Sequence, residues 1–290
     1  MSIPIDSQCL LCHFQRNLEL ADTLGTKEQV MDFARKLMRM YLDAPADAGS
    51  PWFGPKTTQL FYESFGLSPD RYHEEKLQSN RFVMERLPML RETVSNAPDP
   101  VLAGLQCAIL GNYLDFSALR GQVSFEKLEE MLRDALKMEL DSQVYVALCE
   151  DLRQSRKLLY LTDNAGEIGF DRIFAEEIHR WYPQLEITFC VRGGIAQNDA
   201  TREDAEAVGI PFPVIDNGNT VAGTQLDQLS GEAKQALEEA DVILAKGMGN
   251  TETMFGCGYN VYYAFLVKCQ KFVRLFDKPM FTPMLVKERQ

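Results

Sequence analysis

The chain has 290 residues, of which 46% are hydrophobic and 25% charged, as in ordinary globular proteins. Its formal net charge of −12 argues against a broad nucleic-acid surface, which needs a basic footprint, and against docking on anionic lipid. No stretch approaches the ~20 apolar residues of a membrane span, and the first residues have neither the basic start nor the apolar run of a signal peptide. We therefore expect a cytoplasmic protein, without nucleic-acid or membrane partners, in which most of the seven cysteines are buried thiols.

The sequence pattern of residues 1 to about 150 is almost entirely helical. Apolar residues within 30–41 follow the i, i+3, i+4 spacing of an amphipathic helix. Segment 102–110 is apolar on nearly all of its faces, which is typical of a buried helix. A polar stretch at 117–122 then precedes another amphipathic segment at 125–140.

From about residue 156, short apolar segments alternate with helical patterns. The first four expected strands are 157–161, 186–191, 212–215 and 241–245. A helix near 259–269 and a last strand at 272–276 complete the expected order. Such alternation predicts a mostly parallel sheet with helices on both faces. We expect an α/β protein with a helical domain (1–150) that contributes to the active-site cleft, packed on a Rossmann-like three-layer α/β/α catalytic domain (151–290).

The most informative segment is 158–167, in which a short apolar run ends at Asp163-Asn164 and turns towards Glu167. The segment places oxygen ligands where a strand leads into a helix, at the end of an α/β sheet where ligands bind. The alternative is a simple turn or helix cap formed by the Asp-Asn pair, with Glu167 as a favourable acid in the first helical turn.

Polar loops also follow two other expected strands. Asp199 follows the second strand, and neighbouring parallel strands end at the same edge, so its carboxylate should lie near Asp163 and Asn164. Two carboxylates and an amide suit Mg²⁺, Mn²⁺ or a similar ion, although a lone Asp199 is more often a helix cap. Lys246-Gly247 begins a glycine-containing loop that suits an anion, the alternative being a surface lysine in a turn. The combination predicts metal-assisted phosphate hydrolysis.

Cys9 and Cys12 form a single CxxC motif, which is a weak zinc signal without a second pair. His13 and Cys269 would complete a site only if folding brought them together. The alternative is two ordinary thiols on one helix face.

The chain resembles the damage-control phosphatase family, also called domain of unknown function 89. The resemblance extends over most of the chain and rests on five segments in a fixed order: 111–116 (GNYLDF), 163–167 (DNAGE), 198–199 (ND), 246–252 (KGMGNTE) and 268–269 (KC). The CxxC motif together with the late Lys-Cys pair is similar to the prokaryotic subfamily. The resemblance implies a metal-dependent phosphatase with a helical region and a Rossmann-like core.

The resemblance also implies roles for individual residues. It implies that Asp163, Asn164 and Asp199 ligate the catalytic metal. Substrate or phosphate contacts are implied for Glu167, Lys246, Gly247, Asn250 and Lys268, with Asn112 and Asp115 lining the same cleft. A second metal near Cys9, Cys12 and Cys269 is a further conjecture. Two departures from the family pattern are Arg192-Gly193-Gly194, where a proline-containing turn is expected, and Met248 in a variable position.

The favoured hypothesis is a phosphatase that uses Mn²⁺, Co²⁺, Ni²⁺ or Mg²⁺ to hydrolyse a small phosphorylated metabolite, either a sugar phosphate or a damaged phospho-metabolite. Metal-activated water would attack phosphorus while Lys246 and Lys268 stabilise the phosphoryl charge. One alternative makes Asp163 a covalent nucleophile. Another is a non-catalytic metal- or nucleotide-binding module. A Rossmann methyltransferase or dehydrogenase is disfavoured, because the first turn has a single glycine and acids that repel a pyrophosphate.

Overall fold

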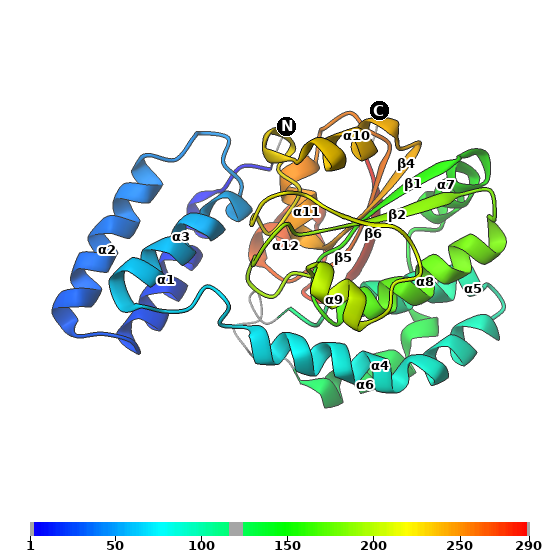
Figure 1. Ribbon diagram of the computed structural model, residues 1–290, viewed down its shortest axis with the longest axis horizontal. Helices are drawn as coiled ribbons and strands as arrows, with labels where there is room; N and C mark the ends of the chain where they lie inside the picture. Colours follow the sequence, from blue (N-terminus) through cyan, green and yellow to red (C-terminus); the bar gives the residue numbers. More distant parts are fainter. Residues whose placement is uncertain (1–2, 116–123, 289–290) are drawn as a thin grey trace.

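The computed structural model describes residues 3–115 and 124–288 (Figure 1). Phe116 and the polar stretch expected at 117–122 lie outside the described residues.

The strands are β1 (Lys157–Leu161), β2 (Glu186–Val191), β3 (Val214–Asp216), β4 (Val242–Lys246), β5 (Val261–Leu266) and β6 (Pro283–Lys287). The helices of the N-terminal half are α1 (Ser7–Asp22), α2 (Lys27–Leu42), α3 (Ser50–Phe65), α4 (His73–Ser95), α5 (Pro100–Gly111), α6 (Phe125–Arg133) and α7 (Ser142–Gln154), with a 3₁₀ turn at Ala135–Lys137. The helices of the C-terminal half are α8 (Glu167–Trp181), α9 (Arg202–Ala207), α10 (Gly231–Glu239), α11 (Gly247–Met254) and α12 (Gln270–Phe276), with a 3₁₀ turn at Leu226–Gln228.

The strands form one sheet in the order β3-β2-β1-β4-β5-β6. Strands β1 to β5 pair in parallel, and β6 pairs antiparallel with β5. The chain runs outward from β1 to β3 and then returns to β4 on the other side of β1. Ligands of open α/β sheets bind beyond the carboxyl ends of the strands at this kind of switch point. The predicted Rossmann-like fold is confirmed.

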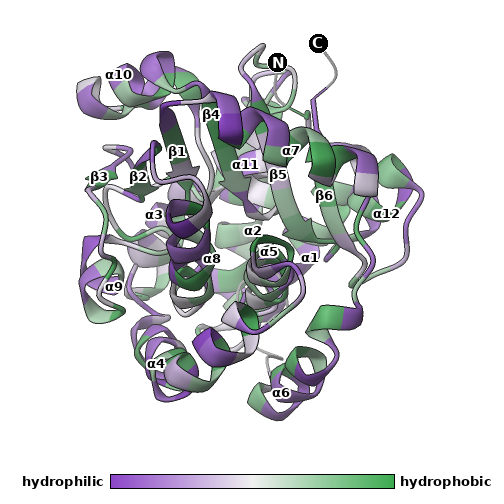
Figure 2. Ribbon diagram, turned by 90° about the vertical axis from the view of Figure 1, so that its right-hand side faces the viewer, coloured by the Kyte–Doolittle hydropathy of each residue, from purple (hydrophilic) through white to green (hydrophobic). Residues whose placement is uncertain are grey.

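Helices cover both faces of the sheet. Leu158 and Tyr160 of β1 belong to the core beneath α5 and α8, whereas Leu159 and Leu161 belong to the core beneath α10 and α12. This alternation follows from the two-residue period of a strand. Figure 2 shows hydrophobic strands at the centre and hydrophilic stretches on outer helices such as α10 and α4.

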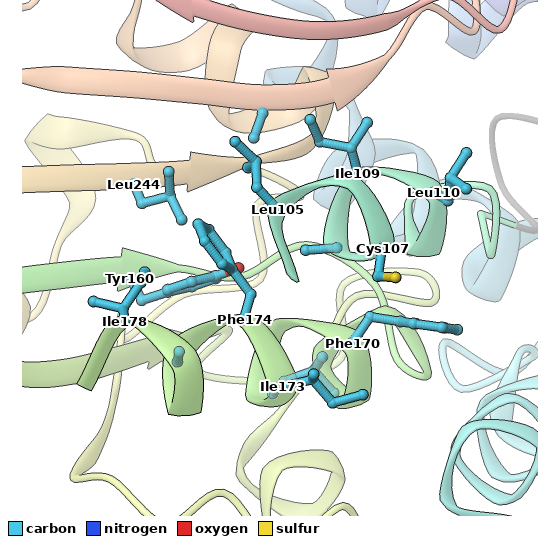
Figure 3. Close-up of a cluster of buried hydrophobic side chains, with 14 of the residues drawn as sticks. Leu105, Cys107, Ile109, Leu110, Tyr160, Phe170, Ile173, Phe174, Ile178 and Leu244 are labelled. Atoms are coloured by element: carbon cyan, nitrogen blue, oxygen red, sulfur yellow. The ribbon is translucent and has the colours of Figure 1, made fainter. Parts of the chain in front are cut away.

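Helix α5 packs closely along α8. A Cβ atom on Gly111 would lie 2.7 Å from the ring of Phe170, and one on Gly104 would lie 3.1 Å from Phe174. Figure 3 shows Phe170 and Phe174 of α8 together with Cys107 of α5 in this buried layer. The glycines permit the close approach of the two helices. The end of α5 consequently lies beside the start of α8, at the carboxyl edge of the sheet.

The N-terminal helices divide into two groups. Helices α1 to α3 enclose a small core of their own, built on Ala21, Phe33, Leu37 and Phe61. Figure 1 shows them to one side of the rest of the molecule. Side chains of α4, α5 and α7 instead join the core of the sheet. The division into domains at residue 150 stays a prediction.

Two expected elements near the C-terminus were assigned to the wrong type. The segment expected as a helix at 259–269 contains β5, and the strand expected at 272–276 lies in α12. Strand β5 is buried on both faces, so its continuous apolar run lacks the alternation that marks a half-buried strand. Helix α12 has only seven residues, too few for a helical period to stand out in its apolar run Phe272-Val273-Arg274-Leu275-Phe276. Strand β6 was not expected.

Within residues 3–115 and 124–288, every helix is too short or too polar to cross a membrane.

Candidate active site

The loops that follow β1 and β2 are joined directly by backbone hydrogen bonds. Ala165 N–H donates to the Asn198 carbonyl at 2.9 Å, and Ala200 N–H donates to the Asp163 carbonyl at 2.7 Å. Asn164 and Asp199 form an isolated antiparallel bridge. The structure therefore brings together the three residues expected to ligate a metal: Asp163, Asn164 and Asp199.

Arg192, at the end of β2, lies between the two aspartates. Its Nε donates to Asp199 Oδ2 at 2.6 Å, and its Nη2 lies 3.7 Å from Asp163 Oδ1. The guanidinium is buried, and Nη2 has no hydrogen-bond partner among the described residues. The family pattern assigns Arg192 no role beyond a departure from the expected proline-containing turn. A charged side chain directly after the apolar run of β2 was the available signal.

The site concentrates negative charge in a buried place. Burial raises the pKa of Asp163 well above its usual value, and the nearby charges of Asp199 and Glu167 raise it further. Burial also raises the pKa of Asp199 to about 6, against the opposing effect of Arg192. A cation placed among these oxygens would relieve the mutual repulsion of the carboxylates.

The hydrogen bonds of Asn164 determine how its amide is oriented. Its Nδ2 donates to Asp163 Oδ2 at 2.8 Å and to Glu167 Oε2 at 2.7 Å. Because ionised carboxylates only accept, the nitrogen must face them. The oxygen Oδ1 then faces Asn198, which donates to it at 2.9 Å. Asn164 thus presents an oxygen on the side of the Asn198-Asp199 loop.

Lys246 lies beneath the site and is fully buried. Its ammonium has three acceptors: the Ala108 carbonyl at 2.8 Å, Glu167 Oε1 at 2.6 Å and Asp171 Oδ1 at 3.0 Å. These acceptors use all three protons of the ammonium group. Lys246 is expected to contact phosphate; in this structure its ammonium faces these three protein acceptors, and the phosphate contact stays a prediction.

Glu167 is likewise fully buried, and its hydrogen bonds are with protein groups. Besides Lys246, it accepts from Asn164 and from Asn112 Nδ2 at 2.9 Å. Burial raises the pKa of its neighbour Asp171 to about 7, against the opposing charge of Lys246. The Glu167 carboxylate therefore orients Asn164 and does not face an open cleft in this arrangement.

The helical region reaches the site through the end of α5. Asn112 Nδ2 donates to Asp163 Oδ2 at 2.9 Å. Lys268, beyond β5, donates to Asp115 Oδ2 at 2.6 Å and to the Asn112 carbonyl at 2.8 Å. The positive charge of Lys268 partly opposes the raised pKa of Asp163.

Gly247 and Asn250 form the start of α11 next to Asp163. Gly247 has φ +76°, and a Cβ atom there would lie 2.0 Å from Asp163 Oδ2. Asn250 is buried, and its Nδ2 donates to the Thr162 carbonyl at 3.0 Å and to the Lys246 carbonyl at 2.7 Å. Asn250 therefore ties the ends of β1 and β4 together, while Gly247 leaves room for the carboxylate.

The three cysteines expected near a second metal do not form a site. No group of three or more His, Cys, Asp or Glu side chains is placed to hold a metal anywhere in the described part of the chain. Cys12 is exposed, and burial raises the pKa of Cys9 to about 12, which disfavours the thiolate that a metal requires. His13 packs instead against Tyr41, whose hydroxyl lies 2.6 Å from its Nδ1. The donor set of Asp163, Asn164 and Asp199 is of a different kind, because it combines two carboxylates with one amide.

Comparison with known proteins explains this set of residues. A family model described as the damage-control phosphatase ARMT1-like domain matches residues 5–282. The chain belongs to the damage-control phosphatase family. The resemblance noted in the sequence is thereby confirmed.

Relatives support the same assignment over their whole length. A damage-control phosphatase of Archaeoglobus fulgidus is 32% identical over 279 residues, covering 93% of both chains. A damage-control phosphatase of Pyrococcus horikoshii is 30% identical over 286 residues, covering 95% of both. The crystal structure of a DUF89 family protein from Pyrococcus horikoshii superposes with a TM-score of 0.81 at 26% identity, covering 100% of both chains.

Proposed function

We propose that this member of the damage-control phosphatase family is a divalent-metal-dependent phosphatase. Its substrate is a small phosphorylated metabolite, either a sugar phosphate or a damaged phospho-metabolite. The observation that carries the proposal is the convergence of Asp163, Asn164 and Asp199 at the switch point of the sheet. The names of the relatives support phosphate chemistry at that place.

The chemistry of the donor set fits a hard divalent cation. Two carboxylates and an amide are oxygen donors of the kind that Mn²⁺, Co²⁺, Ni²⁺ or Mg²⁺ accept. Burial, and then the nearby charges of Asp199 and Glu167, raise the pKa of Asp163, and a cation bound to this carboxylate would offset these effects. Gly247 avoids a side chain that would collide with the Asp163 carboxylate. We assign Asp163, Asn164 and Asp199 as the residues that hold the metal.

Protein cations near Asp163 are suited to a phosphoryl group. A bound divalent cation would supply Lewis acidity, which polarises a phosphoryl oxygen and lowers the pKa of water. Arg192 Nη2 lies 3.7 Å from Asp163 Oδ1 and has no hydrogen-bond partner among the described residues, and Lys268 bonds Asp115 and the Asn112 carbonyl beside the site. We infer that Arg192 joins Lys268 in balancing charge that develops on phosphoryl oxygens. Asp115 holds Lys268 in position.

The test measures phosphate release from an aryl phosphate and from a panel of sugar phosphates, with each of the four metals. We expect metal-dependent turnover by the wild type. Replacement by alanine of either Asp163 or Asp199 should lower kcat/KM by at least about a hundredfold, because the ligand set is broken.

Asp216→Ala is the matched control, since this aspartate ends the neighbouring strand β3 and pairs with Arg202 on the surface. It should retain wild-type activity. Wild-type activity in the Asp163 and Asp199 variants as well would refute the assignment of these ligands. An inert wild type across all substrates and metals would refute the phosphatase.

A further inference from the structure

The turn that follows Asp163 and Asn164 is held from outside by a residue of α4. Gly166 N–H donates to Asn80 Oδ1 at 2.7 Å, and Asn80 Nδ2 donates to Asp204 Oδ1 at 2.9 Å. Asn80 is buried. The orientation of its amide is determined by its partners, because a backbone N–H only donates and an ionised carboxylate only accepts.

Asp204, at the start of α9, connects Asn80 to the loop that follows β2 and carries Asp199. Its Oδ2 accepts from Thr201 N at 2.8 Å and from Thr201 Oγ1 at 2.9 Å. Thr201 follows Asp199 by two residues, as Gly166 follows Asn164 by two. Lys76 of α4 donates to the same oxygen at 2.7 Å, and both charged groups of this ion pair are buried.

We propose that Lys76, Asn80 and Asp204, here called the α4 clamp, position the two loops that carry the metal ligands. Asn80 is the central positioning residue, since it bonds both Gly166 and Asp204. The inference rests on the proposed metal site and deepens it, by assigning the residues that set the relative position of its two halves. No clamp residue is itself assigned a contact with metal or substrate.

The close fit of α4 against the turn supports positioning by the clamp. Gly166 has φ +75°, and a Cβ atom there would lie 2.6 Å from Ser79 Cβ, the residue before Asn80. The turn is thus seated directly on α4, with the Gly166 N–H bonded to Asn80 of the clamp. Buried partners of this kind orient the ligands of metal sites, and their loss typically weakens metal binding by about 10- to 100-fold.

Exchanging the side chains of Asn80 and Asp204 provides a sharp test of the α4 clamp. Asn80→Asp alone sets two carboxylates against each other, and Asp204→Asn alone removes the charge that Lys76 requires. In the double variant N80D/D204N, the new carboxylate accepts from Gly166 and from the new amide, whose oxygen accepts from Thr201 and Lys76. Every hydrogen bond of the clamp is restored and the net charge is unchanged. The two changes should therefore be strongly non-additive.

The first readout is hydrogen exchange of the metal-free protein in peptides that cover 162–170 and 196–201. Asn80→Ala should accelerate exchange in these peptides and leave the sheet unchanged. The second readout is Mn²⁺ affinity by titration calorimetry. We expect each single variant to bind Mn²⁺ about 10- to 100-fold more weakly, and N80D/D204N to recover most of that loss.

Asn260→Ala is the matched control. Asn260 also donates its amide to a carboxylate and a carbonyl, those of Asp151 and Asp241, but it lies at the opposite edge of the sheet. It should leave both readouts unchanged. Wild-type exchange and affinity in Asn80→Ala, or a double variant no better than the singles, would overturn the α4 clamp. A wild type that binds none of Mn²⁺, Co²⁺, Ni²⁺ and Mg²⁺ would overturn the proposed function instead, while the exchange data would still test the clamp.

Discussion

Gly247 is placed where a side chain would collide with Asp163. Its positive φ alone makes alanine unfavourable by about 1–2 kcal/mol, and the added Cβ would lie 2.0 Å from the carboxylate. We expect Gly247→Ala to displace Asp163 and to lower kcat/KM by about a hundredfold, as misplacements of 1 Å can do. Steady-state kinetics with saturating metal would measure this loss.

Gly258→Ala separates the effect of backbone strain from that of the collision with Asp163. Gly258 has φ +82°, but no other atom lies within 4 Å of a Cβ built on it. This variant should lose some stability and keep its activity. Equal activity losses in both variants would show that strain, and not the collision with Asp163, is responsible.

Lys246 forms buried ion pairs with Glu167 and Asp171, which should contribute strongly to stability. Substitution by methionine would leave Glu167 and Asp171 buried without their cation, so we expect a loss of about 3–5 kcal/mol in the free energy of unfolding. Urea denaturation would measure it. Lys157→Met is the control, because its ion pair with Glu239 is exposed and should contribute little. A Lys246→Met protein as stable as the wild type, with only a raised KM, would instead support the predicted contact between Lys246 and phosphate.

Helix α1 contributes a pH-dependent element to the stability of the molecule. Burial lowers the pKa of His13 to about 4, with a smaller effect from Arg16. The unfolded chain takes up a proton at about pH 6.5, whereas the folded chain does not. Stability is therefore full above pH 6.5 and falls as the pH decreases towards 4, by at most about 3 kcal/mol.

Denaturation curves recorded between pH 4 and pH 7 would measure this dependence. His13→Gln should flatten it, and His73→Gln, at an exposed position, should not. A slope unchanged by His13→Gln would show that the acid sensitivity arises elsewhere.

The elements that were predicted correctly are those with a clear local pattern. Strands β1, β2 and β4 end at polar loops, and α5 is apolar all around, so the sequence carried both their type and their position. Strand β5 and helix α12 were exchanged because neither shows its period: β5 is buried on both faces, and α12 has only seven residues. Strand β6 is an antiparallel edge strand after a short connection, which an expectation of βα alternation does not include.

At the scale of the whole molecule, the sequence predicted the position of those site residues that directly follow the parallel strands. The closeness of Asp163, Asn164 and Asp199 could be predicted because parallel strands finish at one edge. Asn80 could not, because it bonds Asp204, 124 residues away, whereas Arg192 bonds Asp199, seven residues away, and was overlooked beside the glycines that follow it. Lys246 was placed near the right groups, but its full burial depends on packing by α5 and α8, which no local pattern reports.

The separate core of α1 to α3 has a consequence for hybrid proteins. Exchange of substrate-recognition regions between relatives is often attempted at an apparent domain border, here residue 150. Such a junction would divide the core that α5 and α8 share, whereas a crossover at 66–72, between α3 and α4, would leave each hydrophobic core within a single parent. The three N-terminal helices are thus the exchangeable module of this chain, and a series of hybrids joined there would show whether they select the substrate.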